Sequence, residues 1–369
     1  MSNAQKILFS SAIALGSLGL AYVPLPGASQ SIVVVSGSEL QEPLAILEMR
    51  FEQQHPGIDL ELKFQGSQDI VNNYIDQKNS FVPTVVIPAN GEVLNDLRDR
   101  WQAQNTVDIE PFYESPQPVA KTLLVAVSWD ERSQELFPSG EFDWAQLEDA
   151  LNKGNWSDIG GDDSWGSFDF VTTDPTRSNS GQLALSLWAQ AETNSRSIEQ
   201  VNFGSADVQT LFGLVKRSVY QPPRSTDILL QEFIARGSSD ADIAMVYESI
   251  ALYRWSQSQV NQSEPYQVLY PSPTVETVST AAIVRRDVSR SQANAGRIFI
   301  DFLTEPEQQE VFVQYGFRPV TSDVDLPSVS GSPWSENIPG VQIEPNFEVV
   351  EAPERAVTEE VIRQWQRSQ

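Results

Sequence analysis

The 369-residue chain contains no cysteine, and this absence excludes several kinds of site. Without a thiol there is no disulfide, no thiolate metal ligand, no cysteine nucleophile and no attachment through a lipidated cysteine. Histidine is almost absent as well, because His55, in the turn "QQHPGID", is the only one. A serine hydrolase with a histidine base would have to use that residue, and a solvated place in a turn is the simpler interpretation of it.

Positive charge is also scarce, since 24 Lys and Arg stand against 50 Asp and Glu, for a net charge of -26. No long basic run occurs, so we expect neither a nucleic-acid partner nor an anionic membrane surface. The nucleophile-elbow, zinc-protease, P-loop and dinucleotide-binding patterns are missing. The acidic clusters "GGDDSWG" and "SSDAD" lack the spacing of a calcium loop. We therefore predict no catalytic residue, no metal ligand and no cofactor.

A long apolar run is missing everywhere after Ser29. Before it, "MSNAQK" is followed by "ILFSSAIALGSLGLAY", which is too short and too rich in Ser and Gly for a membrane span. The small residues Gly27, Ala28 and Ser29 suit a cleavage site. We predict an export signal over residues 1–29 and a mature periplasmic or extracellular chain that begins between Ala28 and Ile32. An uncleaved membrane anchor is the alternative.

What the sequence does contain is an alternation of strand and helix patterns. "SIVVVSG", "ELQEPLAILEMRFEQQ" and "HPGIDLELKF" predict a βαβ unit, and "VPTVVIPA" with "GEVLNDLRDRWQAQ" extends it. This pattern is typical of a doubly wound, mainly parallel sheet. A second α/β unit, also with a doubly wound, mainly parallel sheet, is predicted around "SFDFVTTDP", where a strand leads into the polar stretch "TTDPTRSNSGQLALSLW".

The length and two long strands predict two lobes. A single core seldom exceeds roughly 250 residues, and "QPVAKTLLVAVSW" and "VETVSTAAIVR" are long enough to cross between lobes and serve as a hinge. We expect residues 31–115 and 275–320 to form lobe 1 and residues 120–270 to form lobe 2. Residues 321–369, rich in Pro, Ser and Gly, form a predicted C-terminal extension that ends in a short helix, "TEEVIRQWQ".

Polar residues gather where predicted strands end and helices begin. Ligands in open α/β sheets bind at the carboxyl ends of the strands, and helix starts offer free amides there. The predicted ligand-binding residues are Ser36, Gly37, Ser38, Gly66, Ser67, Arg177, Ser178, Asn179, Ser180, Tyr247 and Glu248. Each helix start also has an ordinary interpretation as an N-cap. Arg177 could clamp an anion or simply be solvated, and Glu248 would repel an oxyanion unless it were protonated or paired.

Several strings carry a family resemblance. "VSGSELQEPLAILEMRFEQQHPGIDLELKFQGSQDI" and "IFIDFLTEPEQQEVFVQYGFRPV" resemble the bacterial extracytoplasmic solute-binding proteins of the molybdate-binding type. "WGSFDFVTTDPTRSNSGQLAL" and "MVYES" are similar to the branch sometimes fused to a von Willebrand factor A domain, although these 369 residues include no such domain. The resemblance spans residues 31 to about 320. It implies a two-lobed, periplasmic-binding-protein-like clamp of type II with a ligand between the lobes, which commonly serves an ABC importer.

Three functions follow as hypotheses. The first is a monomeric extracytoplasmic binding protein that captures a small molecule for the membrane permease of an ABC importer. The second is a sensory or scaffolding module that uses the same clamp, and the third, weakened by the missing base, is a hydrolase. The polar helix starts suit an oxyanion, to which we lean, but they equally suit the carboxylate or hydroxyls of an organic solute.

Overall fold

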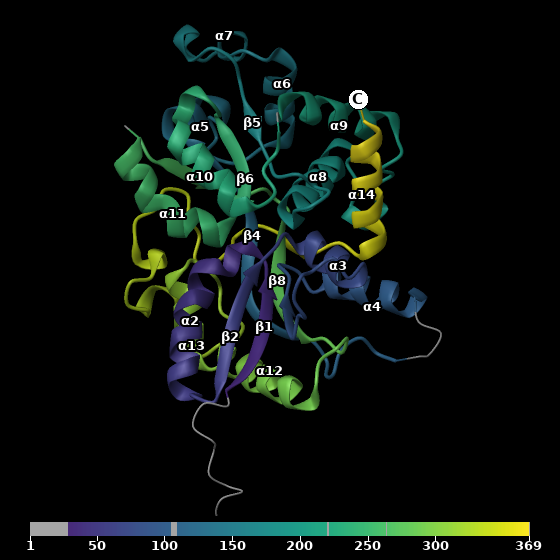
Figure 1. Ribbon diagram of the computed structural model, residues 1–369. Helices are drawn as coiled ribbons and strands as arrows, with labels where there is room; N and C mark the ends of the chain where they lie inside the picture. Colours follow the sequence, from purple (N-terminus) through teal and green to yellow (C-terminus); the bar gives the residue numbers. More distant parts are fainter. Residues whose placement is uncertain (1–28, 105–108, 220, 263, 369) are drawn as a thin grey trace, which may run out of the picture.

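The computed structural model describes residues 29–104, 109–219, 221–262 and 264–368 (Figure 1). The predicted export signal, residues 1–29, falls outside the described part except for its last residue. Within the described residues, no helix is both long and apolar enough to cross a bilayer.

The first part of the chain alternates strand and helix as expected. Its elements are β1 (Gln30–Ser36), η1 (Ser38–Leu40), α2 (Gln41–Gln54), β2 (Ile58–Phe64), α3 (Ser67–Ile75), β3 (Val85–Ile87) and α4 (Glu92–Gln104). β1 lies between β2 and β3 and pairs with both in parallel. Two later helices, α12 (Arg290–Leu303) and α13 (Pro306–Gln314), return to this part and pack against α2. The aromatic ring of Phe51 on α2 contacts those of Phe299 and Phe302 on α12.

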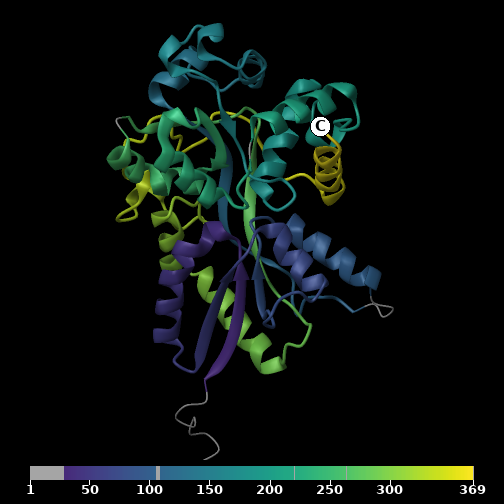
Figure 2. The ribbon, with the colours of Figure 1, turned by 45° about the horizontal axis from the view of Figure 1, so that its top comes forward.

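Two long strands connect this part to the next. β4 (Gln117–Trp129) and β8 (Thr274–Ile283) run antiparallel to each other. β8 also pairs with β3, and β4 pairs with β6, so the strand order is β2-β1-β3-β8-β4-β6-β5. Both predicted crossing strands therefore exist, and each contributes one end to either side of the molecule (Figure 2).

The middle of the chain builds a helix-rich second part. Its elements are α5 (Asp130–Leu136), α6 (Trp144–Lys153), α7 (Trp156–Ile159), η2 (Asp163–Trp165), β5 (Phe170–Val171), α8 (Asn179–Glu192), η3 (Ile198–Gln200), α9 (Ala206–Ser218), α10 (Thr226–Arg236), η4 (Gly237–Ser239), β6 (Ile243–Tyr247), α11 (Glu248–Asn261) and β7 (Tyr266–Leu269). β5 pairs with β6 in parallel, whereas β4 is antiparallel to both β6 and β7. The sheet here is thus mixed, because β4 enters it as a crossing strand.

β5 is shorter than the predicted strand around "SFDFVTTDP", with only two residues. The chain leaves the sheet before Asp174 and Pro175. Proline has no N–H for a strand ladder, and it also restricts the residue before it. The stretch that follows is therefore a loop that leads into α8, which leaves its polar side chains free for other contacts.

The C-terminal extension contains η5 (Leu326–Ser328), η6 (Pro333–Ser335), β9 (Val349–Glu351) and α14 (Arg355–Arg367). β9 pairs in parallel with β8. α14, coloured yellow in Figures 1 and 2, packs against α8 and α9 and also reaches α4. The extension therefore does not merely wrap the surface, because its last helix contacts both parts of the molecule.

Buried apolar side chains form two clusters that divide at the crossing strands. One contains residues between 32 and 120 and between 281 and 317, and the other mainly residues between 123 and 275 and between 313 and 365. We refer to the parts around these clusters as lobe 1 and lobe 2, and propose β4 and β8 as the boundary. The α/β fold class is as predicted.

Candidate functional site

Strand ends from both lobes meet at the boundary between the lobes. In lobe 1 the chain turns at residues 36–39 after β1, at residues 65–67 after β2 and at residues 88–91 after β3. In lobe 2 the loop after β5 leads to α8, and β6 leads directly into α11. Figure 1 shows these turns facing one another across the middle of the molecule. This is the edge at which α/β sheets bind ligands.

Three helices that begin at this boundary lack a side-chain cap. In α3, α8 and α11, no side chain at the N-cap position accepts a hydrogen bond from the first turn. Caps are not distributed by position alone, because α6, α9 and α12 have them, α5, α7 and α13 lack them, and α10, which packs against η1, is capped by Ser225. One first-turn amide of α11 is satisfied differently, because the Ser249 N–H donates to Thr122 Oγ1 over 3.0 Å. Uncapped first turns carry amide donors and partial positive charge, which suits a polar ligand.

The lobes touch directly at what we call the inner contact, formed by Gly66, Asp69 and Arg177. A Cβ atom on Gly66 would lie 2.6 Å from the backbone oxygen of Arg177, so only glycine permits this approach. The Arg177 guanidinium crosses to lobe 1, where Nη2 and Nε lie 2.5 and 3.1 Å from Asp69 Oδ2. Arg177 is therefore at the boundary, as expected, but it forms an ion pair within the chain.

A chain of hydrogen bonds runs from lobe 1 through β8 to lobe 2. The Ala89 N–H donates to Ser67 Oγ over 3.0 Å, and its carbonyl accepts from Thr277 Oγ1 over 2.6 Å. Asn179 Nδ2 then donates to Thr277 Oγ1 over 3.4 Å and to the Tyr247 hydroxyl over 3.0 Å. Burial raises the pKa of Tyr247 well above its usual value, so its hydroxyl stays neutral. The structure thus brings three predicted site residues, Ser67, Asn179 and Tyr247, into one network.

Ser180 has a different environment from the one that sequence reasoning assigned to it. Its fully buried Oγ lies 2.8 Å from Thr173 Oγ1, 3.2 Å from Ser178 Oγ and 2.7 Å from Thr226 Oγ1. These hydroxyls connect the loop after β5 to the start of α10 within lobe 2. Much of the polarity of "TTDPTRSNSGQLALSLW" is therefore used inside the lobe.

The turn after β1 contains a residue that the sequence reasoning missed. Ser36 Oγ donates to the Ile87 carbonyl over 3.3 Å, whereas the half-buried Ser38 hydroxyl has no partner among the described residues. Next to it, the side chain of Glu39 is 8% exposed and its Oε1 has no hydrogen-bond partner in the described part. Burial, with a smaller contribution from the charge of Asp227, raises the pKa of Glu39 to about 7, although a hydrogen bond from its own backbone acts in the opposite direction. An acidic residue in a first helical turn is so common that its sequence carried no distinctive signal.

Glu248, also fully buried, is neutralised from within the chain. Its Oε2 lies 2.8 Å from Arg318 Nε, its Oε1 lies 2.8 Å from Arg318 Nη2, and Tyr270 donates to Oε1 over 2.6 Å. Arg318 follows α13, so this pair joins the end of the lobe 1 helices to the start of α11. Both carboxylate oxygens are engaged, which makes the side chain a structural tie rather than a free charge at the boundary.

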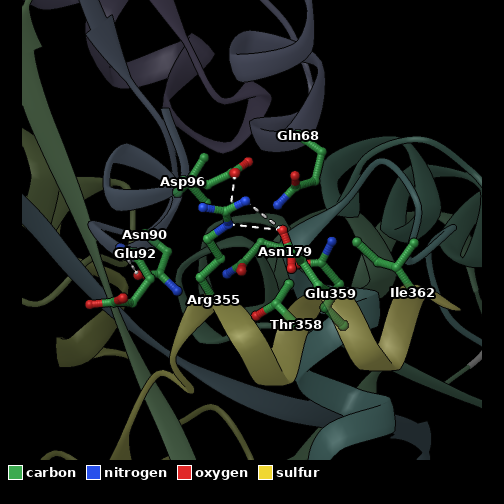
Figure 3. Close-up of a pocket in the computed structure, with 11 residues that line it drawn as sticks. Gln68, Asn90, Glu92, Asp96, Asn179, Arg355, Thr358, Glu359 and Ile362 are labelled. Atoms are coloured by element: carbon green, nitrogen blue, oxygen red, sulfur yellow. Dashed lines mark hydrogen bonds and ion pairs between the residues drawn. The ribbon is translucent and has the colours of Figure 1, made fainter. Parts of the chain in front are cut away.

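The C-terminal helix closes one side of the boundary, as Figure 3 shows. A cavity of about 30 Å³ lies there, enough for a water molecule. Its lining includes Gln68 of lobe 1 and Asn179 of lobe 2, together with Arg355 and Thr358 of α14. Arg355 extends to α4 of lobe 1, where it lies 3.0 Å from Asp96 Oδ1 and 2.8 Å from an oxygen of Asp99.

We call the ion pairs of Arg355 with Asp96 and Asp99 the outer contact. On its other side α14 is fixed to lobe 2. The indole of Trp365 packs near Phe212, and Lys216 donates to the backbone oxygens of Trp365 and Ser368. The outer contact therefore connects a helix carried by lobe 2 to lobe 1.

Comparisons with known proteins agree with this architecture. A family model described as bacterial extracellular solute-binding protein matches residues 32–318. No curated protein matches the sequence. Similar solved structures include a periplasmic thiamin binding protein, with 14% identity, a TM-score of 0.63 and coverage of 92% of this chain and 96% of that one.

Two further structures extend the comparison. The sulfate-binding protein SubI from Mycobacterium tuberculosis has 18% identity, a TM-score of 0.55 and coverage of 79% and 88%. Iron-bound HitA from Pseudomonas aeruginosa has 13% identity, a TM-score of 0.58 and coverage of 92% and 99%. These likenesses concern the fold, and they confirm the predicted two-lobed clamp. Because the family model covers most of the chain, from β1 to the end of the lobe 1 helices, the protein belongs to the bacterial extracellular solute-binding proteins.

Proposed function

We propose that this protein captures a small solute between its two lobes outside the cytoplasm and presents it to the membrane permease of an ABC importer. The observation that carries the proposal is the meeting of uncapped helix starts from both lobes at one boundary. In such a clamp, closure of the lobes and capture of the solute are one equilibrium. The family supports solute binding, and the importer is the partner that the resemblance implies.

The groups best placed to contact a solute are those at the boundary with unused hydrogen-bonding capacity. They are the Ser38 hydroxyl, the first-turn amides after Gly66 and Ser178, and the polar side chain of Asn179. Ser180 and Glu248 contribute indirectly, because their polar atoms hold lobe 2 and its junction with α13 together. Arg177 would act through the inner contact, which forms as the lobes close.

The class of solute is a separate and more specific question than solute capture. The molybdate-type resemblance and the free amides support an oxyanion, but they do not distinguish it from the carboxylate or hydroxyls of an organic solute. The ion pairs of Arg177 and Arg318 argue against an oxyanion, because neither guanidinium is free to bind one in the closed arrangement. The resemblance to the branch fused to a von Willebrand factor A domain concerns ancestry and does not indicate the class of solute.

A thermal-shift screen of the mature chain against oxyanions, amino acids, polyamines and sugars tests the proposal. A solute at 100 times its Kd stabilises the protein by about 2.7 kcal/mol. Ser38→Ala should then weaken binding about fivefold, as expected for one lost hydrogen bond of about 1 kcal/mol, and leave folding unchanged. Ser80→Ala, an exposed serine of the same lobe, is the control. Failure of every solute to stabilise the folded chain would contradict solute capture.

A further inference from the structure

The positive charges near the boundary are already paired with carboxylates. The pairs are Arg177 with Asp69 at 2.5 Å, Arg254 with Asp227 at 2.5 Å, and Arg318 with Glu248 at 2.8 Å. Arg224 is exposed, and only its backbone oxygen approaches Gly66, within 3.5 Å of where a Cβ would lie. The interior of the boundary therefore offers no unpaired cation among the described residues.

Glu39, in contrast, is a carboxyl at the boundary that has no cation as a partner. The side chain is more than nine-tenths buried, its Oε1 has no hydrogen-bond partner, and no Lys, Arg or His nitrogen of the described residues lies within ion-pair distance. Leaving one oxygen of a buried carboxyl without a partner and its charge without a cation is unfavourable, because both the desolvated charge and the unmet hydrogen bond cost free energy. Among the described residues, only a hydrogen bond from its own backbone lowers the pKa of this carboxyl, and no cation does.

The position of the Glu39 carboxyl is fixed by its neighbours. A Cβ on Gly37 would lie 2.1 Å from Glu39 Oε1, so the side chain folds back over the glycine in the turn after β1. η1 packs against α10 of lobe 2, which places Glu39 close to Asp227 and Tyr247. The carboxyl is thus held in lobe 1 and faces lobe 2 across the boundary.

We propose that Glu39 is the anionic anchor of the solute site and that the solute is an organic cation, with a protonated or quaternary nitrogen placed against this carboxylate. The inference rests on the proposed solute-capturing function. An oxyanion would instead lie against Glu39 and Asp227, with no free guanidinium to offset the repulsion. A bare metal ion is a poorer fit, because no group of three or more His, Asp or Glu in the described residues could hold one.

The charge state of Glu39 makes this proposal sensitive to pH. Burial raises the pKa of Glu39 to about 7, so the carboxyl gives up its proton as the pH rises through neutrality. The other charged groups around η1 are Asp227 with its partner Arg254, and Glu42 on α2. A cation binds the ionised carboxyl, so its affinity should increase about tenfold per unit as the pH rises toward 7 and level off above 7.

The test is titration calorimetry and thermal shift with three panels at equal ionic strength. The cations are putrescine, choline and thiamin, the anions are sulfate, phosphate and molybdate, and the neutral solutes are glucose and glycerol. At least one cation should bind, more tightly at pH 8 than at pH 5. Glu39→Gln should weaken that binding at least tenfold and remove its pH dependence, whereas Glu42→Gln, an exposed neighbour on α2, should change neither.

A second variant keeps the test decisive if Glu39→Gln folds poorly. Gly37→Ala retains the carboxyl but displaces it, and should also weaken cation binding. Binding of anions or neutral solutes alone would overturn the inference and leave solute capture standing, as would a cation whose affinity is unchanged in both variants. Binding of no solute from any panel would contradict the proposed function itself.

Discussion

Two of the places at which the lobes meet differ in physical character. The inner contact combines a backbone approach that only Gly66 permits with a short ion pair between Arg177 and Asp69. The outer contact depends on one partly exposed arginine, Arg355, at the start of a helix that follows the family-matched region. The inner contact is therefore specified by shape, while the outer one is mainly electrostatic.

The comparison indicates different roles. A contact limited by van der Waals overlap exists only when the lobes are close, so the inner contact reports closure itself. A partly exposed ion pair tolerates small movements and weakens with salt, so the outer contact should shift the equilibrium between open and closed lobes only slightly. The packing of Trp365 of α14 on lobe 2, which we call the anchor of α14, belongs to neither contact. It should contribute most to the free energy of unfolding.

The largest effect is expected at that anchor. Trp365→Ala removes an indole that is 6% exposed and packs near Phe212, so lobe 2 should lose about 3–5 kcal/mol of unfolding free energy. Urea denaturation followed by circular dichroism measures this loss. Arg363→Ala, on the exposed side of the same helix, should change it by less than about 0.5 kcal/mol. Equal stability of Trp365→Ala and wild type would show that α14 is not a structural part of lobe 2.

The next largest effect concerns the carboxyl of Glu39, which has no cation as a partner. The folded-state pKa of Glu39 is raised from 4.5 to about 7, so its ionisation destabilises the fold as the pH rises between these values. At about 1.4 kcal/mol per pH unit, Glu39→Gln should be up to about 3 kcal/mol more stable than wild type at pH 8 and no more stable near pH 4.5. Denaturation at both pH values tests this, with Glu42→Gln as control. A variant that is less stable at pH 8 would show that the ionised carboxyl is well compensated.

Gly66→Ala should break the inner contact and leave each lobe folded. The added methyl would overlap the Arg177 carbonyl oxygen, which disfavours closure by about 1–3 kcal/mol. Because the chain has no cysteine, spin labels on Met49→Cys and Val260→Cys, exposed positions in lobes 1 and 2, can follow the lobe separation. The distance should lengthen in Gly66→Ala but not in Gly57→Ala, where a Cβ would meet open space. An unchanged distance would mean that Gly66 does not limit closure.

The smallest effect belongs to the outer contact. Arg355→Ala removes the ion pairs to Asp96 and Asp99, and should favour opening by no more than about 1 kcal/mol. The same labelled pair detects the change in low salt, and the difference from wild type should fade at 1 M salt, where the Debye length is about 3 Å. Arg363→Ala, whose partner Glu360 lies on its own helix, is the matched control. An effect larger than that of Gly66→Ala would show that the outer contact contributes more to lobe closure than the inner contact.

Much of the architecture could be predicted from local patterns. β4 begins and ends where the pattern indicated, because it is a long stretch of one periodicity. β5 could not be placed in the same way, since the strand pattern around Phe170 continues into Asp174 and Pro175, where the backbone leaves the sheet.

The site was predictable only in part. Ser67, Asn179 and Tyr247 follow from the rule that ligands bind at strand ends, and the structure joins them in one network. Their role as ligand contacts stays a prediction. Ser180 looked equivalent in the sequence, but its hydroxyl is taken up by three neighbours from distant segments. Hydrogen-bond partners that come from elsewhere in the chain leave no local signal.

By itself, the sequence determined most of the elements and the α/β class, and it predicted the edge at which a ligand would bind, because these follow from periodicity, capping and chain direction. Only the tertiary structure decided which charges remain unpaired there. It paired Arg177 with Asp69, 108 residues earlier, and Glu248 with Arg318, 70 residues later, and left Glu39 without a cation. It also placed α14 between the lobes. Charge pairing and burial depend on contacts between residues far apart in the chain, and such contacts exist only once the chain has folded.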